Sequence, residues 1–449
     1  MNYYIWTEGC QMNVADSQRV AGALEQLGYR PAGAAEQADV IVLNTCVVRQ
    51  SAEDKAYGRL TSLAPLKRQR PDLVINLMGC LVGLREAERL RRAFPHVDVF
   101  SPPSEPGPLI KFLLEREGRD LAAAQTFQRF DYQDEATTVL HPAQAALNLP
   151  EAERGQTVCV HIPVVYGCSH ACTFCIIPYR RGVERSRPQA EIMAEVQALA
   201  AQGVREVTLL GQIVDRYGKD LPSGENLARL LRVIHEVKGL ERIRFLTGHP
   251  NWMTDELLQA VAELPKVCEH IEVPVQAGDD EVLQRMRRGY TADDYRRLVD
   301  RIRRLIPGVS IATDIIVGFP GETAAQFQHT YDLLEELKLD VAHLARYSVR
   351  PGTVAARTLT DDVSAEEKMR RFRLLEDQQA RLVSAINARY LNQTVEVLVE
   401  GRHKNKWMGR TRTNKLVFFA HPADWHGRLA QVNVAHTSPW SMQGTVTEA

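Results

Sequence analysis

Two stretches of the chain alternate short apolar runs with amphipathic segments, and this alternation constrains the fold more than any other feature. In the first hundred residues the apolar runs lie at 3–6, 40–43 and 73–77. Such alternation is typical of βα units around a parallel sheet. We therefore predict an N-terminal α/β domain with a parallel sheet, over residues 1–120.

The same alternation resumes after residue 155. Helical patterns, such as those at 189–202 and 323–338, separate a second set of strand-like runs. These runs lie at 158–162, 207–210, 243–245, 270–273, 310–315 and 341–344. Six βα repeats predict a partial TIM barrel, (βα)6, over residues 154–384, with functional groups at the ends of the strands.

The remaining segments differ in character. Residues 121–153 are polar and lack the alternation, which favours a linker after a helix at about 108–117. A long polar helix at about 364–390 leads into strand-like runs at 394–399, 416–419 and 431–434. These runs predict a small all-β barrel over residues 385–449.

Composition limits the setting of the protein. No run of about 18 apolar residues offers a membrane span, and the N-terminal segment lacks the build of a signal peptide. We therefore expect a cytoplasmic protein, and we expect a monomer. The formal net charge of the 449 residues is −1, so any nucleic-acid site must be a local concentration of Lys and Arg.

Three of the eight cysteines stand close together. Eight are too few for a disulfide scaffold in a chain of this length, which favours metal binding or catalysis. Cys168, Cys172 and Cys175 follow a predicted strand on one loop, and three thiolates suit a cubane iron-sulfur cluster with one iron left open. The alternatives are a zinc knuckle that uses His170 and a chance grouping of structural cysteines.

Three isolated cysteines each follow a predicted strand of the N-terminal domain. They are Cys10, Cys46 and Cys80. Because parallel strands end at one edge of their sheet, these residues form a candidate cluster, although buried thiols are also common in protein cores. We interpret the remaining Cys159 and Cys268 as packing residues.

The trio at 168–175 forms a CxxxCxxC motif with Phe174 before its last cysteine, and this motif resembles the signature of the radical S-adenosylmethionine superfamily. Further segments, in order along the chain, are similar to the methylthiotransferases. They are Thr7-Glu8-Gly9-Cys10-Gln11-Met12-Asn13, Leu43-Asn44-Thr45-Cys46, Met78-Gly79-Cys80, Ile177-Pro178-Tyr179-Arg180-Arg181-Gly182, Ser186-Arg187-Pro188 and Gly318-Phe319-Pro320-Gly321-Glu322-Thr323. The C-terminal barrel resembles a TRAM domain. Gln11-Met12 after the first cysteine is similar to the MiaB-type branch, which acts on tRNA.

This resemblance implies a sulfur-transferring enzyme with two 4Fe-4S clusters. The first would be held by Cys168, Cys172 and Cys175 and would bind S-adenosylmethionine, with Phe174 beside its adenine. The second would be held by Cys10, Cys46 and Cys80. The implied reaction adds a methylthio group to carbon 2 of N6-isopentenyladenosine, next to the tRNA anticodon. The partners would be the anticodon stem-loop of tRNA and an electron donor such as flavodoxin or ferredoxin.

Polar residues after the predicted barrel strands are candidates for contact with S-adenosylmethionine. They are Gln212, Glu272, Gln276, Asp314 and Arg346. They are equally suited to capping helices or closing the barrel. The chain departs from the family at Gln212-Ile213-Val214-Asp215, where Gln-Asn-Val-Asn is usual, and at Ala277, where Ser is usual. His249 is interpreted as a loop residue.

A basic segment of the C-terminal barrel is the candidate RNA site, with Trp407 as a ring that could stack on a base. Its residues are Arg402, Lys404, Lys406, Trp407, Arg410, Arg412 and Lys415. The alternative for this segment is a solvated hairpin. For the whole chain, one alternative keeps the chemistry but takes threonylcarbamoyl-adenosine in tRNA or a ribosomal-protein aspartate as acceptor. Another is a non-catalytic protein that binds zinc and RNA.

Overall fold

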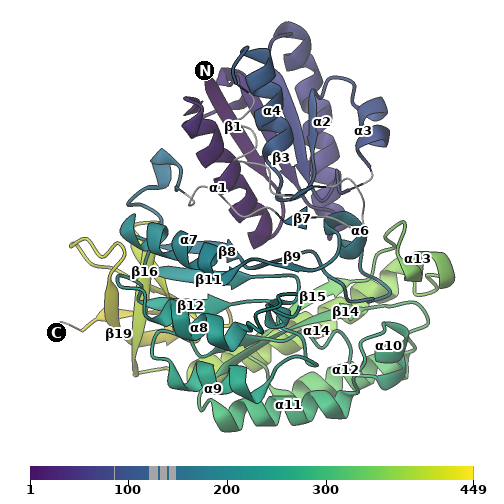
Figure 1. Cartoon of the computed structure of the whole chain (residues 1–449). Coiled ribbons are helices and arrows are strands. Elements are labelled where there is room, and N and C mark those ends of the chain that lie inside the picture. Colours follow the sequence, from purple (N-terminus) through teal and green to yellow (C-terminus); the bar gives the residue numbers. More distant parts are fainter. Residues whose placement is uncertain (85, 121–129, 132–138, 141–147, 448–449) are drawn as a thin grey trace.

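The computed structural model describes residues 1–84, 86–120, 130–131, 139–140 and 148–447. Most of the predicted linker at 121–153 lies outside these residues; within it are the short paired strands β6 (Phe130–Asp131) and β7 (Val139–Leu140) and the 3-10 turn η2 (Glu151–Glu153). The N-terminal domain, the central barrel and a small C-terminal barrel follow one another along the chain (Figure 1).

The N-terminal domain is built on a parallel sheet with the strand order β2-β1-β3-β4-β5. Its strands are β1 (Asn2–Thr7), β2 (Arg30–Pro31), β3 (Val40–Thr45), β4 (Val74–Gly79) and β5 (Val99–Ser101). Its helices are α1 (Gln11–Gln26), η1 (Ala35–Gln37), α2 (Gln50–Gln69), α3 (Ala87–Ala93) and α4 (Gly107–Arg116). The predicted parallel-sheet domain is confirmed, with β2 and β5 as additions at its edges.

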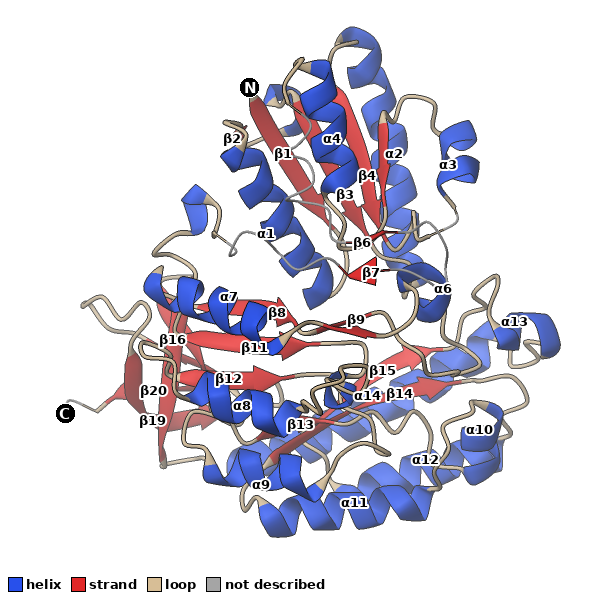
Figure 2. Cartoon of the chain, viewed as in Figure 1, coloured by secondary structure: helices blue, strands red, loops and turns tan. Residues whose placement is uncertain are grey.

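Helices cover both faces of this sheet (Figure 2). Apolar side chains of α1 and α4, such as Leu24 and Leu113, pack with one face of the strands. Leu60 of α2 and Leu90 of α3 pack with the other face. Since β3 and β4 are buried throughout, their continuous apolar runs are those of a sheet covered on both sides.

The central domain is a partial barrel of parallel strands in two sheets, with the orders β12-β11-β8 and β13-β14-β15. Its strands are β8 (Cys159–Pro163), β11 (Glu206–Leu210), β12 (Arg242–Phe245), β13 (His270–Glu272), β14 (Ser310–Val317) and β15 (Val341–Arg346). A parallel bridge between Ile243 and Val267 lies where β12 meets the segment before β13. These strands are those predicted from the alternation, so the partial TIM barrel is confirmed.

Helices surround these strands, and one large apolar core fills the space between them. They are α6 (Ile177–Arg181), α7 (Gln189–Ala201), η3 (Val214–Arg216), α8 (Leu227–His235), α9 (Asp255–Glu263), α10 (Asp280–Arg285), α11 (Ala292–Leu305), α12 (Ala324–Leu337), α13 (Val354–Thr358) and α14 (Ala365–Ala388). A short antiparallel pair, β9 (Val165–Tyr166) and β10 (Arg185–Ser186), brackets the loop that carries the cysteine trio.

The C-terminal segment closes into a small barrel with the strand order β16-β17-β18-β20-β19. Its strands are β16 (Thr394–His403), β17 (Lys406–Thr411), β18 (Leu416–Phe419), β19 (Leu429–Thr437) and β20 (Met442–Val446). The predicted all-β barrel is confirmed. It lies at the end of the central barrel where the parallel strands begin (Figure 1).

Arginines of β12 and of the small barrel join these two units. Arg242 donates to the carbonyl oxygen of Arg410 at 2.6 Å, and Arg244 donates to the carbonyl oxygens of Thr411 and Arg412 at 2.7 and 2.8 Å. In return, Arg412 forms an ion pair with Glu269 at 2.6 Å and donates to the carbonyl oxygen of Val267 at 2.7 Å. Because these bonds are charge-assisted and partly buried, they fix the orientation of the small barrel.

Candidate active site

The loop that carries Cys168, Cys172 and Cys175 follows β9, beyond the carboxyl end of β8. It begins at Gly167, whose φ is +66°, and a Cβ at that position would lie 2.1 Å from the carbonyl oxygen of Val183. Only glycine fits there, so the backbone turns sharply just before the first cysteine. Cys168 and Cys175 pack together with Ile177 and Ile213, and the Cys175 amide donates to the Cys172 carbonyl at 3.2 Å.

Side-chain nitrogens of two residues lie close to the sulfur of Cys172. Arg288 donates from Nη1 to this sulfur at 3.1 Å, and Nδ1 of His170 lies 3.0 Å from it. The guanidinium of Arg288 is buried and also bonds the hydroxyl of Tyr290 at 2.8 Å and the carbonyl oxygen of Pro274 at 3.1 Å. Burial raises the pKa of Cys168 to about 11 and that of Cys175 to about 12, so metal binding would have to release their protons.

Aromatic rings cover this loop. The ring of His170 lies 4.7 Å from that of His249 and 5.4 Å from that of Trp252, and the rings of His249 and Trp252 lie 4.6 Å apart. The guanidinium of Arg216 stacks over Trp252 at 4.4 Å. Burial lowers the pKa of His170 to about 4 and that of His249 to about 2, so both imidazoles are neutral near pH 7. No pattern in the sequence predicts this ring cluster, and only the loop position of His249 was expected.

The three isolated cysteines lie together at the carboxyl edge of the N-terminal sheet. Cys10 follows β1, Cys46 follows β3 and Cys80 follows β4. A Cβ at Gly9 would lie 2.9 Å from the Cβ of Cys46, which brings the Cys10 loop against Cys46. Hydrogen bonding from Cys46 lowers the pKa of Cys80 to about 6, with further help from Arg181, and the same contact raises the pKa of Cys46.

Both trios suit an iron-sulfur cluster. Each contributes three thiols without a disulfide, on loops where glycine lets backbone approach closely, and each has a guanidinium on one sulfur. The described residues contain no group of three or more His, Cys, Asp or Glu side chains arranged for a single metal ion. The ligands of a single ion lie closer together than the sulfur ligands of a four-iron cluster, so the two trios are not arranged for a single ion.

The predicted contacts for S-adenosylmethionine lie around the mouth of the barrel. Phe174 packs edge-on against Phe319, with ring centroids 6.5 Å apart. Gln212 follows β11 and is half-buried, whereas Arg346 ends β15 and is exposed. Gln276 has a φ of +77° and is 8% exposed, and its amide donates to the Asp314 carbonyl at 2.9 Å.

Two carboxyl groups, of Glu272 in β13 and Asp314 in β14, lie on neighbouring strands at this mouth. Burial, and next the charge of Asp314, raise the pKa of Glu272 to about 7. Burial also raises the pKa of Asp314. A positively charged ligand between the two would offset this cost, and S-adenosylmethionine carries positive charge on its sulfonium and its amino group.

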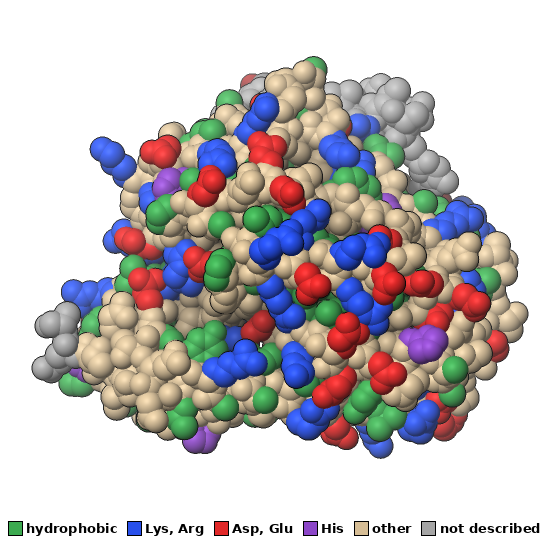
Figure 3. Space-filling view, turned by 90° about the horizontal axis from the view of Figure 1, so that it is seen from below, with side chains coloured by type: hydrophobic (Ala, Val, Ile, Leu, Met, Phe, Trp, Pro, Cys, Tyr) green, Lys and Arg blue, Asp and Glu red, His purple; other side chains and the backbone are tan. Residues whose placement is uncertain are grey.

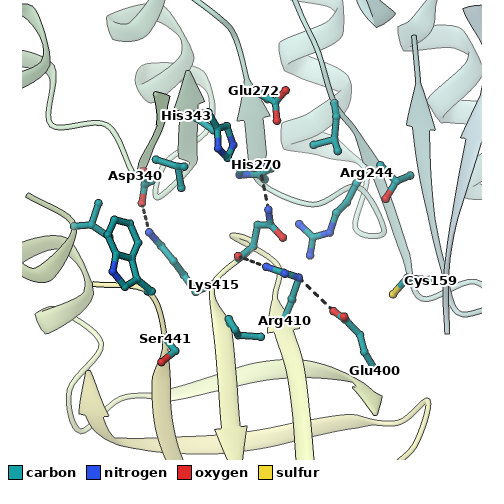
Figure 4. Close-up of a pocket in the computed structure, with 18 of the residues that line it drawn as sticks. Cys159, Arg244, His270, Glu272, Asp340, His343, Glu400, Arg410, Lys415 and Ser441 are labelled. Carbon is teal, nitrogen blue, oxygen red and sulfur yellow. Dashed lines mark hydrogen bonds and ion pairs between the residues drawn. The ribbon is translucent and has the colours of Figure 1, made fainter. Parts of the chain in front are cut away.

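A cavity of about 560 Å³ extends from this region to the small barrel. Figure 4 shows Glu272 and His343 on one side and Arg410, Lys415 and Ser441 on the other. Gln11, at the start of α1, also lines it, so all three domains contribute. Its cations are paired: Arg244 with Glu206 at 2.9 Å, Arg410 with Glu400 at 3.6 Å and Lys415 with Asp340 at 2.8 Å. This balanced lining suits a neutral polar occupant better than a phosphate.

The structure separates the predicted RNA residues into two groups. Arg402, Lys404 and Lys406 are exposed on the β16–β17 hairpin. Arg410, Arg412 and Lys415 instead form the ion pairs with Glu400, Glu269 and Asp340. Arg412 and Lys415 thereby attach the small barrel to the central barrel, whereas the Arg410 pair lies within the small barrel. The sequence window of basic residues does not reveal these partners.

Trp407 is not the exposed ring that the sequence suggested. It is 6% exposed, belongs to the core of the small barrel and donates from Nε1 to the carbonyl oxygens of His421 and Ala423 at 3.1 Å. The reason is the alternation of β17, which turns Trp407, Gly409 and Thr411 inward. The prediction of a base-stacking role for Trp407 is therefore wrong.

Trp440 was not among the predicted RNA residues, and it is exposed at the rim of the cavity. It is 64% exposed and lies between β19 and β20. Its loop is held in place, because Asn387 of α14 donates to the carbonyl oxygens of Ser438 and Pro439 at 2.8 and 3.1 Å. The only available signal was Pro439-Trp440 in a turn between two strands.

On the face seen in Figure 3, Lys and Arg side chains lie among Asp and Glu side chains rather than in one continuous patch. Over the described residues, no helix has the length and apolar character needed to cross a membrane.

Comparisons with known proteins agree with this architecture. Residues 2–101 match the Uncharacterized protein family UPF0004, residues 162–334 the Radical SAM superfamily and residues 388–447 the TRAM domain. The chain is 48% identical to tRNA-2-methylthio-N(6)-dimethylallyladenosine synthase of Roseiflexus sp. (strain RS-1), covering 100% of this chain and 90% of that protein. It is 47% identical to the protein of the same name from Chloroflexus aurantiacus, covering 98% and 91%.

Among solved structures, the fold is similar to the radical S-adenosylmethionine methyltransferase TsrM from Kitasatospora setae, with cobalamin and a [4Fe-4S] cluster bound. The TM-score is 0.55 at 16% identity, covering 79% of this chain and 76% of that one. The cobalamin-dependent S-adenosylmethionine radical enzyme OxsB gives a TM-score of 0.51 at 14% identity, covering 86% and 56%. These likenesses concern the fold.

Proposed function

Because the chain belongs to the family of the tRNA-2-methylthio-N(6)-dimethylallyladenosine synthases, we propose that it adds a methylthio group to carbon 2 of N6-isopentenyladenosine next to the tRNA anticodon. The observation that carries the proposal is a contact between the second cysteine trio and the segment that follows the first trio in the other domain. Arg181, which follows the loop of the first trio, contacts Cys80 of the second at 3.2 Å. Such an arrangement suits a reaction that needs two clusters near one substrate.

In this proposal Cys168, Cys172 and Cys175 hold a cluster that binds S-adenosylmethionine, and Cys10, Cys46 and Cys80 hold a second cluster. When bound, these groups would supply the methyl group, the sulfur and the radical that the unreactive carbon-hydrogen bond requires. Phe174 would lie against the adenine. Glu272 and Asp314 would face the positive charges of S-adenosylmethionine, with Gln212, Gln276 and Arg346 around them. The raised pKa of Glu272 supports a cationic ligand there.

The exposed residues of the small barrel would bind tRNA. Arg402, Lys404 and Lys406 would neutralise phosphates of the anticodon stem-loop, and Trp440 would stack on an unpaired base. Lys406 donates to Gln443 at 2.7 Å, so a cation lies beside the strand that follows Trp440. Arg412 and Lys415 would act only by holding the small barrel against the central barrel, and Arg410 by its ion pair within the small barrel.

The remaining parts of the proposal concern the whole protein. We propose domains at 1–120, 154–384 and 385–449 joined by a linker at 121–153, and the three family matches fall within those domains. We also propose a monomer that acts in the cytoplasm and receives electrons from a flavodoxin or ferredoxin.

The decisive experiment is anaerobic reconstitution with iron and sulfide, followed by incubation with S-adenosylmethionine, dithionite and prenylated tRNA. Mass spectrometry of the nucleosides should find 2-methylthio-N6-isopentenyladenosine. Deoxyadenosine without modified tRNA would point to threonylcarbamoyl-adenosine or a ribosomal-protein aspartate as acceptor. Bound zinc with no iron would favour the non-catalytic alternative.

The RNA interface is tested by the paired change of Lys404 and Lys406 to Ala. Removing two phosphate contacts should weaken tRNA binding and reduce its salt slope by about 2. The change Trp440→Ala should weaken binding about 5- to 150-fold without altering that slope, since stacking is worth about 1–3 kcal/mol per base. Trp440→Phe is the matched control that retains a ring. Unchanged affinity in both Ala variants would place the RNA elsewhere.

A further inference from the structure

Arg181 is a buried cation at the boundary between the N-terminal domain and the central barrel. It is the last residue of α6 and is 9% exposed. Its Nε donates to the sulfur of Cys80 at 3.2 Å, and its Nη1 donates to the hydroxyl of Ser104 at 3.3 Å. The carboxylate of Asp16, which is 1% exposed, lies 3.6 Å from Nη1. The guanidinium is thus aimed at the thiol by groups on two other segments, Ser104 and Asp16.

The helix that carries Arg181 also joins the two domains mechanically. It begins two residues after Cys175, and Ile176 before it packs in the core that contains Cys80. Arg180 forms an ion pair with Glu86 at 3.6 Å, and a Cβ at Gly83 would lie 2.8 Å from Cδ of Arg180. Arg181, which contacts Cys80 of the second trio, therefore lies only six residues after Cys175 of the first trio.

The first trio has a comparable cation of its own. Arg288 is 4% exposed and donates to Cys172 at 3.1 Å, with Tyr290 and the Pro274 carbonyl holding its other nitrogens. Each trio thus has one sulfur that accepts from a fixed, buried guanidinium. A guanidinium stays protonated at every accessible pH, so this charge is permanent.

We propose that Arg181 is a positioning residue that sets the reduction potential of the second cluster and keeps Cys80 ligated, while Arg288 does so independently for the first. The inference rests on the proposed function, because it presumes two clusters. Hydrogen bonds to the sulfurs and the local charge are among the factors that set cluster potentials. A positive charge stabilises the reduced, more negative cluster, so its removal lowers the potential.

The test is an EPR-monitored redox titration of the reconstituted full-length protein. Arg181→Gln should move the potential of the second cluster to more negative values and leave that of the first unchanged. Arg288→Gln is the matched control and should give the reverse pattern. Arg181→Lys keeps the charge and should stay closer to the wild type than Arg181→Gln. No shift in Arg181→Gln, or equal shifts in the Gln and Lys variants, would overturn the inference.

Iron content covers the case in which a variant fails to hold its cluster. Loss of about four irons in Arg181→Gln but not in Arg181→Lys would support a charge that retains Cys80 as a ligand. Equal loss in both would overturn it, because a steric role would then explain the result. A wild-type protein that binds only one cluster would instead contradict the proposed function.

Discussion

The two cysteine trios reach similar surroundings by different routes. Cys168, Cys172 and Cys175 share one loop, whereas Cys10, Cys46 and Cys80 come from three loops and meet only because β1, β3 and β4 are parallel neighbours. The first trio can therefore be recognised from spacing alone. The second can be recognised only from the sheet order or a family resemblance. Two sites suited to the same chemistry can therefore differ in how well the sequence predicts them.

Their burial differs as well. Cys46 and Cys80 are 4% and 1% exposed, whereas Cys10 is exposed; in the first trio Cys168 is buried and Cys172 and Cys175 are half-buried. Arg181 of the central barrel contacts Cys80, so part of the cover of the second trio comes from another domain. The first trio lies within the central barrel, with His170 beside Cys172.

The comparison is tested most severely by removing one cysteine from each trio. Cys172→Ala should abolish formation of 5′-deoxyadenosine, because it removes a ligand of the cluster proposed to bind S-adenosylmethionine. Cys46→Ala should leave that cleavage partly intact and remove the methylthio product. The measurements are deoxyadenosine and modified nucleoside in the same reaction. Equal loss of both activities in both variants would mean that the trios are not separable.

Glycines before the cysteines give a second, smaller perturbation. Gly79 has a φ of +96°, and a Cβ there would lie 2.4 Å from the carbonyl oxygen of Thr45. Gly79→Ala should thus cost about 3 kcal/mol or more and disturb the second trio, since a clash adds to the strain of the positive φ. Gly167→Ala should disturb the first trio in the same way. Iron content and thermal unfolding report both effects.

Gly28→Ala is the control for these two variants. Gly28 has a φ of +93°, but a Cβ there meets nothing within 4 Å. It should cost only about 1–2 kcal/mol and leave the iron content unchanged. An equal loss of iron from Gly28→Ala would show that general destabilisation, rather than the local turn, governs cluster retention.

The fold could be predicted well because the spacing of apolar residues along the chain indicates where the strands and helices lie. The continuous apolar runs of β3 and β4 and the alternation in β16 are local signals. The two-residue strand β2 carries too little pattern to be recognised, and it exists because Arg30 pairs with Asn2 of β1. Short edge strands of this kind form by pairing with another strand, and the local sequence does not predict that pairing.

The site was less predictable, since side-chain partners come from distant segments. Lys415 and Arg412 look like members of one basic cluster, yet their carboxylates are Asp340 and Glu269 of the central barrel. Trp407 and Trp440 were separable only by knowing which positions of the small barrel face its core. Arg181 was visible as part of a motif, but its contact with Cys80 requires the docked domains.

Buried carboxyl groups near the two trios provide the finest comparison. Asp215 lies beside the first trio: its Oδ2 accepts from the His249 amide at 2.9 Å, and its Oδ1 is buried with no hydrogen-bond partner among the described residues. Burial raises its pKa to about 7. Asp16, beside the second trio, has the guanidinium of Arg181 as an ionic partner. Burial raises the pKa of Asp16 as well, but the Arg181 guanidinium opposes this shift, whereas no ion pair of Asp215 is found among the described residues.

These environments predict opposite effects for the same substitution. Asp215 keeps a proton in the folded protein that the unfolded chain releases near pH 4. The contribution of this group to the free energy of unfolding is therefore fully present below about pH 4 and is lost as the pH rises to about 7. Asp215→Asn removes this loss and should stabilise the protein at pH 8, by up to about 1.4 kcal/mol for each unit of pKa shift. Urea unfolding at pH 5 and pH 8 measures the difference.

Asp16→Asn should instead destabilise the protein at pH 8, because it removes one of the two anionic groups beside the buried Arg181 and leaves only the Cys80 thiolate. Breaking a buried ion pair typically costs about 3–5 kcal/mol, and the remaining thiolate makes the loss smaller. If Asp215→Asn also destabilised at pH 8, the Asp215 carboxylate would have a partner that offsets its burial, and the first trio would resemble the second in this respect. A higher free energy of unfolding for Asp215→Asn, together with a lower one for Asp16→Asn, would mean that an ion pair offsets the burial of the carboxylate only beside the second trio.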